Sequence, residues 1–425
     1  MKRRISNVVV ITMTGLFAFM VFSEETNINV RPDSADFCYR VGDKAVVEVS
    51  SADVKGNVEI WVDDGWTNVV WRRTVDFAKE PIVTVEGITR GTPGVLRLHV
   101  CPKGHGEKVD RLLFDWRSIK PLTPCPDDFE AYWKNELARL EREIPIAVDK
   151  ELVPHLSGKN RNVYSVSFAT FNGGRVHGLL SVPKGAGPFP VCVNVPGAGA
   201  GPVSISSDQA REGWIALMLD IHGYPVCRTK EEQRVRHEAW LEDIRLRGGE
   251  KTYQRYGFGL GRDKPIYHDL LLGMVRAIDW LAKEPYADAS RFIYSGGSQG
   301  GGFGIYLTAM WGRFEKSLIL FPNMCDMLAY KFGRQPGSEH IMDQTPVHRL
   351  AAESTGPYYD ACNFALMIRT PVRMIHGLSD TNCHTEGGIA AFNSMPSKDK
   401  AIKLVPRLGH NGRNKFGFDE WVFGL

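Results

Sequence analysis

One serine of this chain stands between a short apolar run and a glycine-rich helix start. The segment Gly296-Gly-Ser-Gln-Gly300 fits the pattern G-x-S-x-G, with Ser298 at its centre. The apolar residues 292–294 predict a strand before it, and residues 303–311 predict a helix after it. A serine in such a turn is strained, so its neighbours must be small for strand and helix to pass closely. The pattern predicts Ser298 as a nucleophile; the alternative is a small-residue loop that only joins strand to helix.

A serine hydroxyl is a poor nucleophile near neutral pH, so a base must take its proton and a third group must orient that base. Asp380 follows an apolar run in Met374-Ile-His-Gly-Leu-Ser-Asp380, and His410 follows the next one in Leu404-Val-Pro-Arg-Leu-Gly-His410. The chain order Ser, Asp, His is the one found in α/β-hydrolases. We therefore predict Ser298, Asp380 and His410 as the catalytic residues.

Each partner of the serine has an alternative interpretation. Asp380 stands in Ser-Asp-Thr-Asn and His410 in Gly-His-Asn-Gly, and both segments favour turns. His376 and His384 flank Asp380 and compete with His410 for the role of base. We expect His376 to be a hydrogen-bonded residue behind the site and His384 to line the pocket wall.

The oxyanion of a tetrahedral intermediate needs two backbone N–H groups, one from the residue after the nucleophile. That residue is Gln299, and the loop Pro196-Gly-Ala-Gly-Ala-Gly201 after a predicted strand supplies the second, for which we predict Ala198. The glycine run also resembles a dinucleotide fingerprint, but the G-x-G-x-x-G frame is incomplete and no suitable acidic residue follows. No GK[ST] for a P-loop occurs either, and the sequence predicts no cofactor.

Strands and helices alternate from about residue 119 onward, which predicts an α/β fold with a mostly parallel sheet covered on both faces. Leu271, Met274, Val275, Ile278 and Leu281 fall on one face of a helix predicted over residues 267–283. The polar, charged segment 227–264 is predicted to form a lid or rim at the carboxyl ends of the strands. The predicted strands cover residues 163–168, 176–182, 191–195, 215–219, 292–294, 316–320, 372–375 and 402–405.

The N-terminal region has a different pattern, with short β-rich runs at 44–49, 58–62, 82–85 and 95–100. Their spacing predicts a small β-sandwich over residues 24–118, before a catalytic domain over 119–425. Three prolines in Lys120-Pro-Leu-Thr-Pro-Cys-Pro126 mark the junction, and Asp127 and Asp128 open a helix. We expect this domain to be a packing or positioning module, with carbohydrate binding as the alternative role.

The composition and the N-terminal sequence argue against some classes of function and predict where the protein is located. The 425 residues carry a formal net charge of +3 without basic runs, which argues against nucleic acid as a partner. Residues 1–23 combine a basic start and an apolar run, which predicts a signal peptide and a secreted or periplasmic protein without stable membrane insertion. The cleavage site is imperfect, so an uncleaved anchor stays open, as does a homo-oligomer.

The cysteine pattern carries two expectations. Cys38 and Cys101 are the two cysteines of the N-terminal region, and in an exported protein they are candidates to form a disulfide. The other six cysteines show no spacing with histidine that is typical of a structural metal site, so the sequence predicts no metal.

Taken together, these motifs resemble the acetyl xylan esterase and cephalosporin-C deacetylase family of α/β-hydrolases over roughly residues 123–416. The matching segments are Pro126-Asp-Asp-Phe-Glu-Ala-Tyr-Trp133, Asp279-Trp-Leu, Gly296-Gly-Ser-Gln-Gly-Gly-Gly302, Gly377-Leu-Ser-Asp-Thr-Asn-Cys383, Ala390-Ala-Phe-Asn393 and Gly409-His410. The resemblance implies a serine carboxylic-ester hydrolase that removes acetyl groups from carbohydrate esters such as acetylated xylan or xylo-oligosaccharides. It implies the same nucleophile, acid and base, and the N–H of Gln299 in the oxyanion hole.

Three departures from the family leave the alcohol part of the substrate open. Pro196-Gly-Ala-Gly199 stands where the family usually has His-Gly-Tyr-Gly. Ile221-His-Gly-Tyr224 stands where the family usually has Arg-Gly-Gln, and His384 and Thr385 stand where it has two prolines. Fold and triad do not choose the substrate, so a peptidase or broader esterase remains an alternative. From another class, a glycan-binding protein without turnover is a further alternative.

Overall fold

The structure is a computed structural model that describes residues 27–199, 204, 211–248, 252–338, 340–410 and 418–424. The predicted signal peptide, residues 1–23, lies outside the described residues. Within them, no helix is both long and apolar enough to cross a lipid bilayer.

A nine-stranded sheet forms the centre of the C-terminal part, in the order β17-β16-β15-β14-β12-β13-β11-β10-β9. The six strands from β17 to β13 run parallel, and β11, β10 and β9 continue the sheet antiparallel. The fold is therefore mixed α/β with a large, mostly parallel sheet, as predicted. The strands are β9 (Val148–Leu152), β10 (Arg161–Ala169), β11 (Arg175–Pro183), β12 (Phe189–Asn194), β13 (Ile215–Leu219), β14 (Ala287–Gly297), β15 (Lys316–Leu320), β16 (Val372–Gly377) and β17 (Lys400–Val405).

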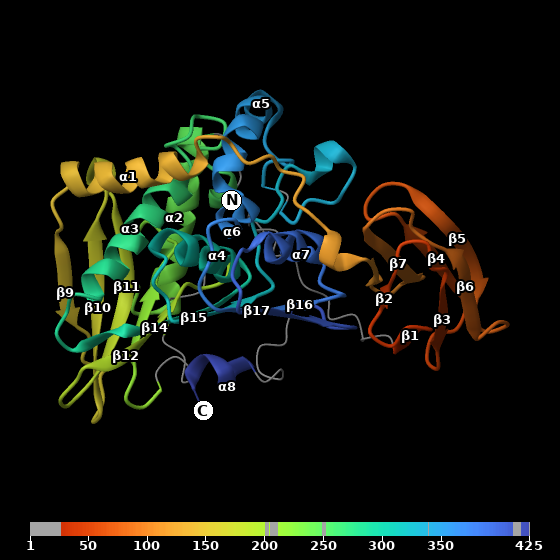
Figure 1. The fold of residues 1–425 in the computed structure, drawn as a ribbon, viewed down its shortest axis with the longest axis horizontal. Helices are drawn as coiled ribbons and strands as arrows, with labels where there is room; N and C mark the ends of the chain where they lie inside the picture. The colour runs from red at the N-terminus through yellow and green to blue at the C-terminus, as the bar shows by residue number, and fades with distance from the viewer. Residues whose placement is uncertain are drawn as a thin grey trace, which may run out of the picture.

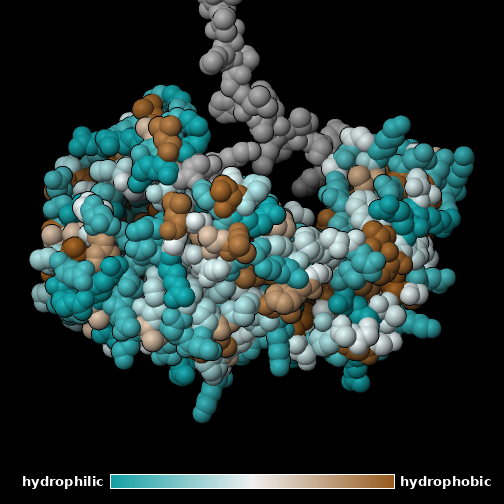
Figure 2. Space-filling view, turned by 90° about the horizontal axis from the view of Figure 1, so that it is seen from above, coloured by the Kyte–Doolittle hydropathy of each residue, from teal (hydrophilic) through white to brown (hydrophobic). Residues whose placement is uncertain are grey.

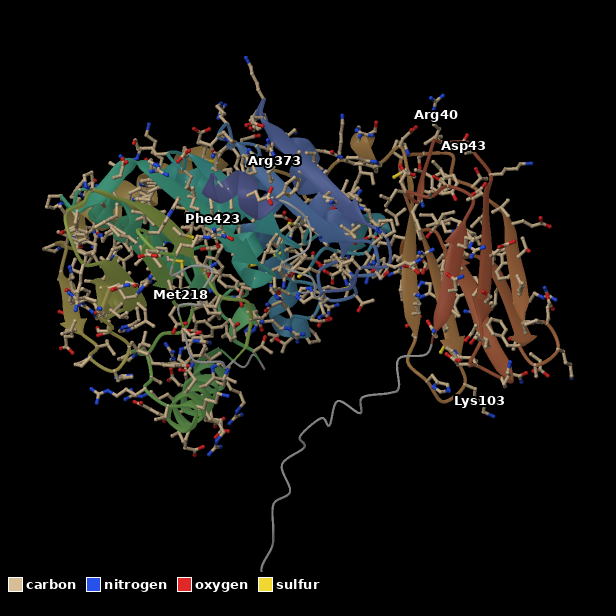
Figure 3. All side chains as sticks on the ribbon, turned by 90° about the horizontal axis from the view of Figure 1, so that it is seen from below. Arg40, Asp43, Lys103, Met218, Arg373 and Phe423 are labelled. Carbon is tan, nitrogen blue, oxygen red and sulfur yellow. The ribbon has the colours of Figure 1, made fainter. Side chains whose placement is uncertain are left out.

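The parallel strands are apolar because both faces of the sheet are covered. Val191 and Val193 of β12 belong to the main hydrophobic core, whereas Cys192 between them faces a second, smaller core. In Figure 1, α3 and α4 lie on one side of the sheet and α8 lies on the other. Phe423 of α8, labelled in Figure 3, is buried in the second core.

The helices differ in what stabilises them. The predicted apolar face on α3 is buried along the helix, whereas α2 is held by ion pairs three or four residues apart, such as Arg234–Glu238. Asp128 occupies the N-cap of α1, but its side chain accepts from Tyr358 Oη instead of capping the helix. The helices are α1 (Phe129–Glu143), α2 (Lys230–Gly248), α3 (Ile266–Leu281), α4 (Gln299–Trp311), α5 (Pro346–Thr355), α6 (Ala361–Ala365), α7 (Thr385–Ser394) and α8 (Phe418–Phe423), with 3₁₀ turns η1 (Trp116–Ser118), η2 (Phe171–Gly173), η3 (Tyr253–Arg255), η4 (Ala329–Phe332) and η5 (Gly356–Tyr359).

From residue 27, where the description begins, to residue 114, eight strands form a three-stranded sheet β1-β3-β6 and a five-stranded sheet β2-β8-β7-β4-β5. Val47 and Val85 of the first sheet and Ile60 and Leu98 of the second are fully buried in one hydrophobic cluster. The four predicted strands are confirmed, and four others were missed. The strands are β1 (Ile28–Pro32), β2 (Cys38–Tyr39), β3 (Ala45–Ser51), β4 (Asn57–Asp63), β5 (Val69–Asp76), β6 (Ile82–Ile88), β7 (Gly94–Pro102) and β8 (Lys108–Phe114).

The expected disulfide between Cys38 and Cys101 is wrong, because both thiols are free. Cys38 pairs with Leu113 of β8, which pairs in turn with Val95 of β7. Cys101 lies six residues farther along β7, about 20 Å away at the usual rise of a strand. Disulfides need Cα atoms within about 7 Å. In Figure 3, Arg40 and Lys103, close in sequence to these cysteines, lie at opposite ends of the sheets.

Hydrophobic residues are scattered over the face of the molecule seen from above (Figure 2). Figure 2 shows a mainly hydrophilic face on which hydrophobic residues form scattered patches over both parts of the chain. Val347 and Leu350 on α5 are among the most exposed large hydrophobic residues, at 82% and 78%. Scattered exposed residues of this kind are normal in soluble proteins, so they define no docking surface.

Candidate active site

Ser298 occupies the sharp turn between β14 and α4, as predicted. Its φ of 61° and ψ of −124° lie in a region that non-glycine residues seldom adopt. The glycines that follow have no room for a side chain. A Cβ on Gly300 would lie 2.1 Å from the carbonyl oxygen of Val195, and one on Gly301 would lie 2.5 Å from that of Leu320. The glycine run thus lets α4 start directly against the ends of the neighbouring strands.

The three residues predicted for catalysis come together at the carboxyl edge of the sheet. His410 Nε2 lies 3.0 Å from Ser298 Oγ, and His410 Nδ1 lies 3.1 Å and 3.0 Å from the two carboxylate oxygens of Asp380. These distances suit transfer of the serine proton to the imidazole and orientation of that imidazole by the carboxylate.

The environment of Asp380 keeps it ionised. Its side chain is buried, and Oδ1 accepts hydrogen bonds from the backbone N–H groups of Asn382 and Cys383 at 2.9 Å and 3.0 Å. Burial alone raises the pKa of Asp380, but the hydrogen bond with His410 and the other contacts leave it below its usual value. A carboxylate is therefore available to fix the imidazole at neutral pH.

The two competing histidines lie elsewhere. His384 lines a pocket, as expected, and its Nε2 lies 2.8 Å from the side-chain amide nitrogen of Gln335. His376 is fully buried, but the expectation that it is hydrogen-bonded is wrong, because neither ring nitrogen has a hydrogen-bond partner among the described residues. Of the three histidines, only His410 has a hydrogen bond to the serine hydroxyl among the described residues.

Burial of His376 makes the stability of the fold depend on pH. Burial lowers the pKa of His376 from 6.5 to about 4, and Asp380 opposes this effect while Arg111 adds to it. Since the unfolded chain binds the proton first, stability from this group is complete above pH 6.5 and is lost as the pH falls toward 4. We predict that this one group accounts for a loss of about 3 kcal/mol in the free energy of unfolding over that range.

Chemical denaturation at pH 7, 5.5 and 4.5 checks this prediction. The wild type should lose stability more steeply toward low pH than the variant His376→Leu, which carries no titratable group at this position. Equal slopes for the two proteins would show that His376 does not remain neutral in the folded state.

Both predicted oxyanion donors lie beside the nucleophile. Gln299 is the first residue of α4, where backbone N–H groups have no partner within the helix. The loop that carries Ala198 follows β12, and a Cβ on its neighbour Gly197 would lie 3.7 Å from Ser298 Cβ. The structure therefore brings the loop that carries Ala198 next to the start of α4, where Ser298 and Gln299 lie.

Three residues that the sequence did not single out hold this arrangement. Tyr253 Oη donates to the side-chain oxygen of Gln299 at 2.7 Å. His222 Nε2 lies 3.0 Å from the carbonyl oxygen of Gly199, and His222 Nδ1 lies 2.8 Å from Asp220 Oδ1. A signal was present, since His222 lies in the segment that departs from the usual Arg-Gly-Gln.

Two pockets adjoin residues of the site: Ala198 lines the first, and Thr381 and Asn382, which follow Asp380, line the second. One, of about 320 Å³, runs from Ala198 to Leu241 of α2 and Tyr253, so part of the predicted lid segment lies at the rim. The other, of about 350 Å³, is polar and has these lining residues: Thr252, Gln254, Arg255, Asn323, Ser338, His340, Asp343, Thr381, Asn382 and His384. Among the described residues, no group of His, Cys, Asp or Glu is placed to hold a metal ion.

Comparison with known proteins places the chain in a family. The sequence profile of the acetyl xylan esterase family matches residues 109–423. The acetyl esterase Axe7A of Xylanibacter ruminicola is 28% identical over 377 residues, covering 87% of this chain and 84% of its own.

Solved structures agree at the level of the fold. Acetyl xylan esterase 1 from Thermoanaerobacterium sp. has a TM-score of 0.59 at 22% identity, and the acetyl xylan esterase from Paenibacillus sp. R4 has 0.57 at 23%. Each comparison covers 73% of this chain and 96% of the other. Since the family profile spans most of the sequence, this chain belongs to the acetyl xylan esterase family and is a carboxylic-ester hydrolase.

Proposed function

We propose that the protein removes acetyl groups from carbohydrate hydroxyls, with Ser298 as nucleophile, His410 as base and Asp380 as the residue that orients the base. The observation that carries this proposal is the series of hydrogen bonds that links Ser298 Oγ to His410 and His410 to Asp380. Family membership supports the ester chemistry. The resemblance to an acetyl esterase supports acetyl as the acyl group.

The geometry supports a two-step reaction. Ser298 Oγ attacks the ester carbonyl carbon while His410 Nε2 takes its proton, and the backbone N–H groups of Gln299 and Ala198 receive the negative charge on the carbonyl oxygen. The intermediate then collapses, and the sugar hydroxyl leaves with the proton from His410. Water, activated by the same imidazole, hydrolyses the acetyl-serine, which releases acetate and restores Ser298.

Polar lining of the second pocket supports a sugar as the alcohol part of the ester. Thr381 and Asn382 directly follow Asp380, and the backbone N–H of Asn323 donates to the carbonyl oxygen of Ser298 at 3.1 Å. Their side chains, with those of Arg255 and Asp343, offer hydrogen-bond donors and acceptors in this pocket. A long acyl or alkyl chain would leave these polar groups without water or partners.

The chain also divides into regions with different roles. We propose that the two N-terminal sheets form a β-sandwich domain over residues 24–118, joined to a catalytic domain over 119–425. The basic and apolar N-terminal sequence supports export to the periplasm or the medium, with residues 1–23 as signal peptide.

The test is acetate release from acetylated xylo-oligosaccharide, compared with hydrolysis of 4-nitrophenyl acetate and 4-nitrophenyl octanoate. We expect wild-type protein to release acetate from the oligosaccharide and to favour the acetate ester over the octanoate by at least about tenfold in kcat/KM. Ser298→Ala is the matched control for spontaneous hydrolysis. Preference for octanoate would support a broad esterase instead, and no release from any ester by folded protein would support a glycan-binding role.

A further inference from the structure

The loop that carries Asp380 is bounded on two sides by the catalytic part of the chain. It leaves β16 at Gly377 and enters α7 at Thr385. The backbone N–H groups of Leu378 and Ser379 donate to the carbonyl oxygens of Val405 and Leu408, on the segment that leads to His410. These hydrogen bonds fix the loop on the side of His410. The opposite side of the loop contacts a different part of the chain.

The opposite side of the loop contacts strand β8 of the N-terminal part. Arg111 Nη1 donates to the carbonyl oxygen of Leu378 at 3.0 Å, and Arg111 Nε lies 3.1 Å from both carboxylate oxygens of Glu386. On the neighbouring residue of the same strand, Asp110 Oδ1 accepts a hydrogen bond from Ser379 Oγ. Two consecutive residues of β8 thus hold the two residues before Asp380 and the sixth residue after it.

A second connection comes from the adjacent strand β7. Arg97 is paired with Asp63 within the same sheet, and its Nη1 donates to the side-chain oxygen of Gln335. The amide nitrogen of that glutamine lies 2.8 Å from His384, which is in the same loop as Asp380. The five-stranded sheet therefore contacts the loop through polar side chains of two strands, and the two sets meet at His384, whose Nδ1 lies 3.4 Å from Arg111 Nη2.

Because Arg111 and Glu386 are buried, we expect them to act on the geometry of the Asp380 loop more than on the stability of the fold. The side chains of Arg111 and Glu386 are each 1% exposed. A buried ion pair gains little net stability over an apolar pair of similar size, because both charges lose their hydration. What such a pair does supply is a fixed direction for its hydrogen bonds, here toward Leu378 and Glu386 on both sides of the acid.

We propose that Arg111 and Asp110 are positioning residues for Asp380, so that the N-terminal sheet takes part in building the active site. This inference rests on the triad proposed above. The backbone at Leu378 and Ser379 is held so that the carboxylate of Asp380 meets His410 Nδ1. Loss of these contacts allows the loop to shift while the nucleophile and the pocket stay in place.

A double-mutant cycle tests this coupling with 4-nitrophenyl acetate, a substrate that makes no demand on the sugar site. Because a displacement of about 1 Å at a catalytic group can cost about 100-fold in rate, we expect Arg111→Met to lower kcat by about 10- to 100-fold. KM should change by less than about threefold. In the Asp380→Asn background the same substitution should lower kcat by less than about threefold, because the group it positions no longer works.

Two further variants complete the test. Arg111→Lys, which keeps the charge, should recover part of kcat. Asn393→Ala removes two other hydrogen bonds, one to the carbonyl oxygen of Trp116 in the N-terminal part and one to that of Ile119 at the start of the catalytic part, and should leave kcat within about twofold of wild type.

Melting temperatures distinguish a variant that does not fold from a folded variant in which the Asp380 loop has moved. If Arg111→Met does not fold, the paired variant Arg111→Met/Glu386→Met replaces the buried ion pair with apolar side chains and is tested in the same cycle. A kcat that falls by the same factor with Asp380 and with the Asp380→Asn substitution would overturn the proposal, as would an unchanged kcat in folded protein. Loss of the oligosaccharide activity alone would contradict the proposed substrate and leave this inference standing.

Discussion

Replacing Ser298 with alanine is expected to lower kcat/KM for 4-nitrophenyl acetate by at least about 10⁴-fold, because no other group can form the acyl intermediate. The folded state should hardly change, since Ser298 Oγ contacts little beyond His410 and Cys383. The measurement is initial rate against substrate concentration, with the melting temperature taken on the same samples.

Cys383 provides the control for this experiment. Its sulfur lies 3.9 Å from Ser298 Oγ, and burial raises the pKa of its thiol far above its usual value, so it is a poor nucleophile. Cys383→Ala should therefore retain activity within about tenfold of wild type. A Ser298→Ala protein with near-normal activity that vanishes on further replacement of Cys383 would contradict the proposed nucleophile.

The second large effect concerns the base. His410→Ala is expected to lower kcat by about 10³- to 10⁴-fold or more, because the serine proton loses its acceptor. His384→Ala removes the competing histidine, which lies in the loop of Asp380, and should cost far less, mainly through the pocket wall and Gln335. Steady-state rates on 4-nitrophenyl acetate for the two variants check this difference.

The reverse pattern would require a different base. If His384→Ala lost activity while His410→Ala kept it, the imidazole beside Ser298 in the structure would not be the group that works in solution. Activity lost equally in both variants, with normal melting temperatures, would show that the reaction needs both histidines.

Much of the catalytic part could be predicted because its signals are local. A strand, a strained serine and a glycine run follow one another directly, so Ser298 could be placed on its turn without any knowledge of distant contacts. Asp380 and His410 each follow a strand, and parallel strands bring their carboxyl ends to one edge of a sheet. The apolar stripe of α3 was visible for the same reason, since its period is set within the helix itself.

The contacts between the two parts of the chain could not be predicted in this way. Arg111 and Glu386 are 275 residues apart, and neither stands in a motif. The Cys38–Cys101 prediction failed because β2, the strand that carries Cys38, was not predicted and because the sequence pattern does not give the register of the strands. His376 was expected to have a hydrogen-bond partner because buried polar groups usually do, and only the packed structure shows that it has none among the described residues.

Reaction with diethyl 4-nitrophenyl phosphate shows whether Ser298 is the residue that forms the covalent intermediate. The serine oxygen attacks phosphorus and 4-nitrophenolate leaves, so a stable diethylphosphoryl serine results. We predict one label per chain on the peptide that contains Ser298, with activity lost in proportion to labelling and no labelling of Ser298→Ala. Labelling at another residue, or full activity in protein labelled at Ser298, would contradict the account.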